Sequence, residues 1–145
     1  MKIIKSILII ALFFGLWIVF CWPINISDNL QAKRFEFNAW IYKDDIITKC
    51  EDIQCVFEKV TENYKFNDTN MNDRLKLLTK NPNEVVLYGG VCRDYAVTYC
   101  AALWDLEDTT CYIHVENNHA FNVVWQGNQY CVIDQKDMIC SEFKI

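Results

Sequence analysis

The chain has 145 residues, of which 23% are charged, and a formal net charge of −5. This length suits a single domain, and the charged fraction is ordinary for globular proteins, which excludes a wholly disordered chain. Every acidic residue lies after position 27, so the domain lacks the basic surface that nucleic-acid phosphates require. The sequence contains no nucleotide-binding motif and no pair of cysteines separated by two residues, and we therefore predict no cofactor and no structural metal.

The N-terminal segment differs in composition from the rest of the chain. Lys2 and Lys5 precede an almost purely apolar run that extends from Ile7 to Trp22. This pattern predicts a membrane anchor or a signal sequence over residues 1–24, followed by a linker over 25–39. The run lacks the small residues of a cleavage site, so we favour an uncleaved single-pass anchor over secretion after cleavage. Little chain precedes the anchor, which places the domain outside the cytoplasm.

Apolar residues between Asp44 and Tyr64 recur at intervals of three and four, which is typical of one face of an amphipathic helix. Cys50 lies on this face and Cys55 far around from it, so a bridge between the two conflicts with a continuous helix. A second, short helix is expected over residues 72–79, ended by the sequence Asn-Pro-Asn at 81–83.

The pair Gly89-Gly90 is the sharpest break in the chain, and a helical pattern begins at Cys92 directly after it. The period then changes to two, which predicts strands over 111–115, 119–125 and 130–134, with a hairpin turn at 126–129 between the last two. Helices therefore come first and an antiparallel sheet follows, so the fold class is α+β.

A cysteine at the start of a helix is a candidate nucleophile. The thiolate is the reactive form, and the free N–H groups and partial positive charge of a helix N-terminus favour it. Arg93 adds to this effect, whereas Asp94 opposes it but can accept hydrogen bonds from N–H groups of the first turn. A small buried cysteine is the more common explanation for such a position when it is taken alone.

The register of the predicted hairpin brings a histidine next to a carboxylate. With Trp125 opposite Tyr130, His119 becomes the diagonal neighbour of Asp134 on one face of the sheet, within hydrogen-bonding reach. A thiol, an imidazole and an orienting carboxylate are the groups that nucleophilic acyl chemistry requires. His114 is the alternative base, but the register places no carboxylate beside it.

The blocks Gly-Val-Cys-Arg-Asp-Tyr-Ala at 90–96, His-Ala-Phe-Asn-Val-Val at 119–124 and Val-Ile-Asp at 132–134 resemble the transglutaminase-like superfamily. The resemblance implies a papain-like fold over 40–145, with N-terminal helices packed on a small antiparallel sheet. It also implies a catalytic triad in which Cys92 is the nucleophile, His119 the general base and Asp134 the orienting acid. The backbone N–H of Cys92 is expected to be one oxyanion donor, and the candidates for the second are Tyr88, Gln54 and Trp40.

These observations favour a thiol-dependent amide hydrolase, similar to a cysteine protease, that acts on a peptide or protein, or on a wall-like polymer outside the membrane. Three alternatives remain. An acyl transferase of the transglutaminase type uses the same groups, a binding module would keep the fold without the chemistry, and a disulfide-rich surface protein would bridge Cys92. The remaining cysteines of the domain are expected to form disulfides if it lies outside the cytoplasm, although their pairing cannot be read from the sequence. These cysteines are Cys50, Cys55, Cys100, Cys111, Cys131 and Cys140.

Overall fold

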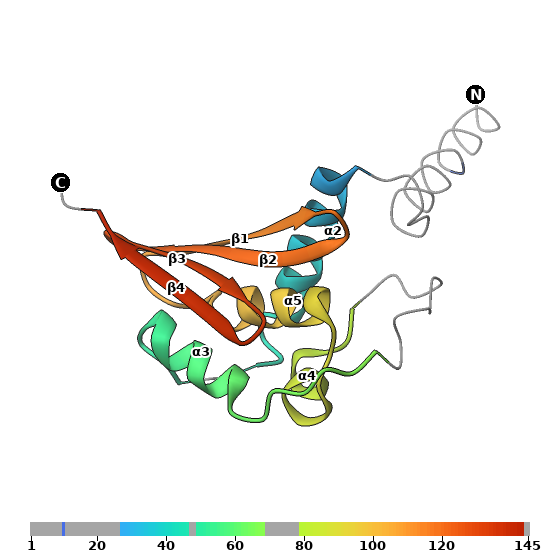
Figure 1. Cartoon of the computed structure of the whole chain (residues 1–145), viewed down its shortest axis with the longest axis horizontal. Helices are drawn as coiled ribbons and strands as arrows, with labels where there is room; N and C mark the ends of the chain where they lie inside the picture. Colours follow the sequence, from blue (N-terminus) through green and yellow to red (C-terminus); the bar gives the residue numbers. More distant parts are fainter. Residues whose placement is uncertain (1–9, 11–26, 47–48, 69–78, 144–145) are drawn as a thin grey trace.

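The computed structural model describes residues 10, 27–46, 49–68 and 79–143 (Figure 1). Within these ranges four helices precede one antiparallel sheet, which confirms the α+β fold class. The helices are α2 (Asp28–Tyr42), α3 (Ile53–Thr61), α4 (Pro82–Tyr88) and α5 (Cys92–Ala102). The strands are β1 (Thr109–Glu116), β2 (His119–Gln126), β3 (Gln129–Asp134) and β4 (Asp137–Glu142), in the sheet order β1-β2-β3-β4.

The sheet is a meander in which each strand pairs with the next through a tight turn. Trp125 pairs with Tyr130 and Val123 with Val132, so the register expected from the sequence is confirmed. Strand β4 was not expected. It forms the edge of the sheet and is exposed along almost its whole length, so its sequence carries no alternation of buried and exposed residues.

The linker expected over 25–39 is wrong, because most of that segment lies in α2. Phe35 and Ala39 of this helix are buried against α5 and β1, so the helix belongs to the domain, which begins well before residue 40. Its buried positions include an asparagine and two alanines beside the aromatic residues, and for this reason the apolar face is hard to see in the sequence.

The long helix expected over 44–64 is also wrong in extent. The helix α3 begins only at Ile53, after Asp52, whose side chain accepts a hydrogen bond from the N–H of Cys55. Because Cys50 lies before the helix, it is free to turn back, and it forms a disulfide with Cys55. The bridge is therefore compatible with α3, because this helix begins after Cys50.

The sequence Asn-Pro-Asn at 81–83, which was expected to end a helix, begins the helix α4. The side chain of Asn81 accepts from the N–H of Asn83, and Pro82 occupies the first turn of α4, where its missing N–H costs no hydrogen bond. The helix expected over 72–79 lies outside the described residues except for Thr79. The predicted membrane segment lies outside them as well, apart from Ile10, and none of the described helices has the length and apolar character to cross a membrane.

Helix α5 is the centre of the fold. It is buried from Asp94 to Ala102, with α2 and α4 beside it and the sheet across it (Figure 1). One core cluster joins its Tyr95 and Tyr99 to α3 and the inner face of β2 and β3, and a second joins Ala96 and Cys100 to α2 and β1. A disulfide between Cys100 and Cys111 links the helix to β1.

The buried tyrosine of α5 predicts a loss of stability at alkaline pH. Burial, followed by the charges of Tyr95 and Tyr64, raises the pKa of Tyr99 from its ordinary value of 10.0. Below pH 10 Tyr99 keeps its proton in the folded and the unfolded state, so its full contribution to the free energy of unfolding is present. Above pH 10 the unfolded state releases the proton first, and the free energy of unfolding falls by about 1.4 kcal/mol per pH unit for this group.

We therefore expect Tyr99→Phe to reduce this alkaline slope by about that amount, although it loses a buried hydrogen bond worth about 1 kcal/mol at neutral pH. Urea unfolding from pH 9 to pH 11 measures the slope, in a Cys92→Ala background that stops thiol–disulfide exchange. Tyr112→Phe, at an exposed phenol, is the matched control. An equal slope in the two variants would contradict the assignment.

Candidate active site

The turn before Cys92 needs both of its glycines. Gly89 has a φ of +81°, and a Cβ at this position would lie 2.2 Å from the carbonyl oxygen of Lys65. A Cβ on Gly90 would lie 2.7 Å from the Cβ of Asp94. The two glycines therefore let the chain pass between Lys65 and the first turn of α5.

The carboxylate of Asp94 holds this turn from inside. It is 3% exposed and accepts hydrogen bonds from the N–H groups of Val91 and Lys80, at 3.1 and 3.2 Å. The ammonium of Lys80 in turn donates to the carbonyl oxygens of Gly89 and Asn67. Asp94 thus serves as the helix cap that the sequence suggested, and it also joins the segment that enters α4 to the start of α5.

Cys92 is the first residue of α5 and is half-buried. It packs on the core cluster that contains Ala120, the residue that directly follows His119. Among the described cysteines it alone is unbridged, because the other six form the pairs Cys50–Cys55, Cys100–Cys111 and Cys131–Cys140. A disulfide role for Cys92 is therefore wrong.

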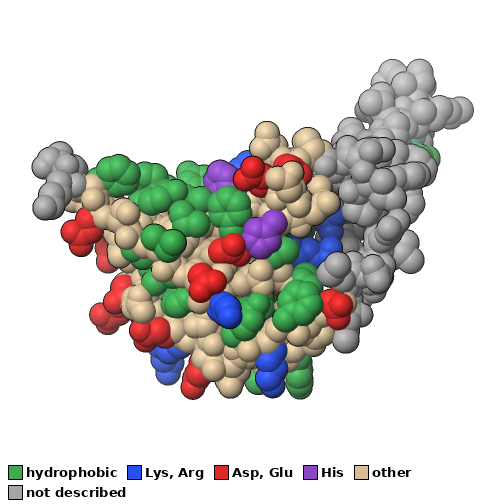
Figure 2. Space-filling model, in the orientation of Figure 1, with side chains coloured by type: hydrophobic (Ala, Val, Ile, Leu, Met, Phe, Trp, Pro, Cys, Tyr) green, Lys and Arg blue, Asp and Glu red, His purple; other side chains and the backbone are tan. Residues whose placement is uncertain are grey.

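His119 and Asp134 are in direct contact, as the hairpin register requires. The Nε2 atom of His119 lies 2.9 Å from each carboxylate oxygen of Asp134. Their side chains are 42% and 46% exposed, and Figure 2 shows histidine at the molecular surface. Because Nε2 faces the carboxylate, Nδ1 is the nitrogen left to exchange a proton with another group.

Two tyrosines hold the turn that follows Asp134. The hydroxyl of Tyr99, on α5, donates to the backbone carbonyl of Gln135, and the hydroxyl of Tyr64 donates to its side-chain oxygen at 2.6 Å. Gln135 itself has a positive φ of 54°, which is uncommon for a residue with a side chain. The helix that begins with Cys92 is therefore tied directly to the residue next to Asp134.

The charges of Cys92 and Asp134 both act on the phenol of Tyr64. Burial raises the pKa of this phenol most, and the charges of Tyr95, Asp134, Asp137 and Cys92 raise it further. Tyr64 stacks on Tyr95 with ring centroids 4.8 Å apart, and this stacking keeps the phenol against α5. A neutral phenol thus lies between the segment that carries the thiol and the segment that carries the carboxylate.

Asn122 makes a second link between α5 and the strand that carries His119. It is 1% exposed on the inner face of β2, and its amide donates to the carbonyl of Ala96 at 2.9 Å. A polar residue between Ala120 and Val124, on a face that is otherwise apolar, was the sequence signal for this role. Tyr64, Tyr99 and Gln135 offered no comparable signal, because the contacts that define them are long-range.

The remaining candidates are less closely connected to this site. His114 stacks on Phe121 and has no carboxylate partner among the described interactions. The amide of Gln54 donates to Glu58, and the ring of Trp40 stacks on Phe37, each within its own helix. Tyr88 is exposed at the end of α4 and is the one oxyanion candidate on the segment that leads into Cys92.

No cluster of three or more His, Cys, Asp or Glu side chains suited to a metal ion occurs in the described part of the chain.

The buried carboxylate of Asp94 predicts that a substitution of equal volume at this position lowers the stability of the fold. Asp94→Asn keeps the side-chain volume but replaces one of the two accepting oxygens by an NH₂ group, which faces an N–H donor. We expect the free energy of unfolding to fall by about 1–3 kcal/mol. Asp105→Asn, at an exposed position, is the matched control and should change stability little. Urea denaturation of both variants measures the difference, and equal losses would show that the cap contributes no stability.

A comparison with known proteins identifies the family of the chain. A family model described as a transglutaminase-like domain matches residues 31–142, which include α5, the sheet and most of α2. No curated protein and no solved structure was found to match the chain. The family match covers more than half of the sequence and spans Cys92, His119 and Asp134, and the chain therefore belongs to the transglutaminase-like family.

Proposed function

We propose that the protein is a thiol-dependent amide hydrolase that acts through a covalent thioester, with Cys92, His119 and Asp134 as its triad. The observation that carries the proposal is the contact of His119 Nε2 with both oxygens of Asp134, in a domain where the unbridged Cys92 begins the central helix. A binding module has no need of these three groups together.

The proposed first half-reaction uses these three groups in turn. Nδ1 of His119 takes the proton of the Cys92 thiol, and the N-terminus of α5 stabilises the resulting thiolate. The sulfur attacks the amide carbonyl, and the C–N bond breaks as the imidazolium returns its proton to the leaving amine. Asp134 keeps the imidazole oriented and stabilises its charged form. The N–H of Cys92 is the first oxyanion donor, and Tyr88 is our choice for the second.

The second half-reaction decides between the two enzyme classes. Water attacks the thioester in a hydrolase, with His119 as general base, and releases a carboxylic acid and the thiol. An amine in the same place yields a new amide, as in an acyl transferase. The candidate groups are half exposed, which supports access of water and makes hydrolysis the default. The acyl transferase is the second candidate.

The three disulfides support a location outside the cytoplasm. Structural bridges form and persist in oxidising compartments and are rare in reducing ones. Together with the apolar run before residue 23, this favours a domain that is held at the outer face of a membrane, where its substrate is a peptide or protein, or a wall-like polymer.

The proposed triad predicts selective alkylation of Cys92. Iodoacetamide near neutral pH should modify this thiol first, as read by peptide mapping of the labelled chain. We expect His119→Ala to slow the modification about tenfold or more, because the base that removes the thiol proton is lost. His114→Ala is the matched control, since this histidine has no carboxylate partner in the described structure. Equal rates in the two variants would exclude His119 as the base.

The choice between hydrolysis and transfer predicts one of two products. We incubate the protein with a glutamine-containing peptide and a fluorescent primary amine, and expect cleaved or deamidated peptide without incorporated amine. Mass spectrometry distinguishes the products, and Cys92→Ala, which should retain the circular dichroism spectrum, serves as the inactive control. Incorporation of the amine as the main product would make the acyl transferase correct. Unchanged turnover by Cys92→Ala would refute both.

A further inference from the structure

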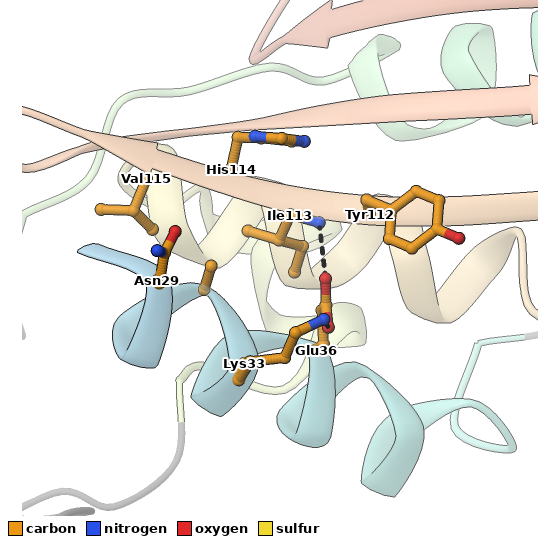
Figure 3. Close-up of a pocket in the computed structure, with 8 residues that line it drawn as sticks. Asn29, Lys33, Glu36, Tyr112, Ile113, His114 and Val115 are labelled. Atoms are coloured by element: carbon orange, nitrogen blue, oxygen red, sulfur yellow. Dashed lines mark hydrogen bonds and ion pairs between the residues drawn. The ribbon is translucent and has the colours of Figure 1, made fainter. Parts of the chain in front are cut away.

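A groove separates α2 from the first strand of the sheet. Its cavity has a volume of about 400 Å³ and is lined by one face of α2 and by residues 112–115 of β1 (Figure 3). Val115 and Ile113 are directed toward the helix, and His114 lies on the opposite side of the strand. A volume of this size is typical of a ligand site. The proposed chemistry gives the groove no role.

The strand that lines the groove is an edge of the sheet. Among the described strands β1 pairs only with β2, and a two-residue turn closes this hairpin, with Glu116 opposite His119. The backbone N–H of Ile113 points away from β2, because it donates to the carboxylate of Glu36 on α2 at 3.3 Å. Antiparallel pairing alternates with a period of two, so the N–H and C=O groups of Val115 point into the groove as well.

The carboxylate of Glu36 accepts the N–H of Ile113, as the backbone carbonyl of a neighbouring strand would do. One of its oxygens accepts from Ile113, and the other accepts from Lys33 at 2.6 Å. The side chain of Lys33 is 69% exposed and that of Glu36 is 22% exposed. If another acceptor binds the N–H of Ile113, Glu36 keeps its ion pair with Lys33, so the exchange costs little free energy. Charged side chains of this kind commonly protect sheet edges.

We propose that this groove binds an extended peptide, which adds to the free edge of β1 as a further strand. The outward N–H and C=O groups of Ile113 and Val115 repeat about every 7 Å, a spacing that matches the backbone of another extended chain. Main-chain hydrogen bonds of this type supply affinity with little dependence on sequence. Side chains of the bound peptide would alternate between α2 and the side that carries His114.

Residues that line the groove share neighbours with the candidate active site. His114 lies opposite Phe121 in the register, and the Phe121 ring stacks between the rings of His114 and His119. Val115, which lines the groove, packs on the same core cluster as Cys92. The inference thus deepens the proposed function by giving a peptide substrate a binding site next to its reactive bond. Its test reads binding and not turnover, so a failure of the thiol chemistry would be a separate result.

The experiment uses the full-length Cys92→Ala chain in mild detergent and a capped probe peptide, Lys-Thr-Val-Gln-Val-Thr-Lys. We expect binding to shift the amide resonances of Ile113 and Val115. Two N-methylated versions of the probe, one at the odd-numbered and one at the even-numbered residues, distinguish strand addition from other binding. In an added strand, the N–H groups of alternate probe residues face β1 and the others face away. Methylation of the set that faces β1 should lower the affinity about tenfold or more, and methylation of the other set should change it little.

Glu36 provides an independent check on the protein side. Glu36→Ala frees the N–H of Ile113 and should tighten binding of the probe about threefold or more. Glu36→Gln keeps an accepting oxygen at the same position and should leave the affinity close to that of the parent. The proposal is overturned if the probe does not bind at millimolar concentration, if both N-methylated versions lose affinity equally, or if Glu36→Ala binds no better than Glu36→Gln.

Discussion

The burial of α5 on all sides is the constraint on which the rest of the structure depends. A helix in this position can bury polar groups only if each finds a partner, as the carboxylate of Asp94 and the carbonyl of Ala96 do. The bond from Asn122 to Ala96 and the bond from Tyr99 to Gln135 hold β2 and the end of β3 against the helix. The positions of Cys92, His119 and Asp134 are therefore consequences of core packing.

The elements that local rules govern could be predicted from the sequence. Two-residue periodicity and a short turn determine the pairing of β2 with β3, so the neighbourhood of His119 and Asp134 followed without a structure. The helix start at Cys92 followed from the glycines before it. What local rules could not supply are contacts between distant segments. The packing of α2 on β1 and the anchoring of Gln135 by Tyr64 and Tyr99 depend on the whole fold.

Both errors in the helices have the same physical origin. A periodic apolar pattern says which side chains are buried, but it does not say whether the backbone between them is helical. Ile46 and Cys50 both lie before α3 and pack on the core, and they completed a pattern that looked like one long helix. In α2 the converse holds, because Ala32, Asn38 and Ala39 are buried without being strongly apolar.

The helix between Cys92 and Cys100 also affects which disulfides form when the chain is oxidised. Cys100 has two neighbours in sequence, Cys92 and Cys111, and loop-closure entropy slightly favours the shorter loop to Cys92. Pairing with Cys92 would consume the reactive thiol during oxidative maturation. Once α5 forms, however, eight residues of helix hold the two Cα atoms about 12 Å apart, well beyond the span of a disulfide. Folding of this single helix before oxidation thus protects the thiol, and it leaves Cys100 to its partner on β1.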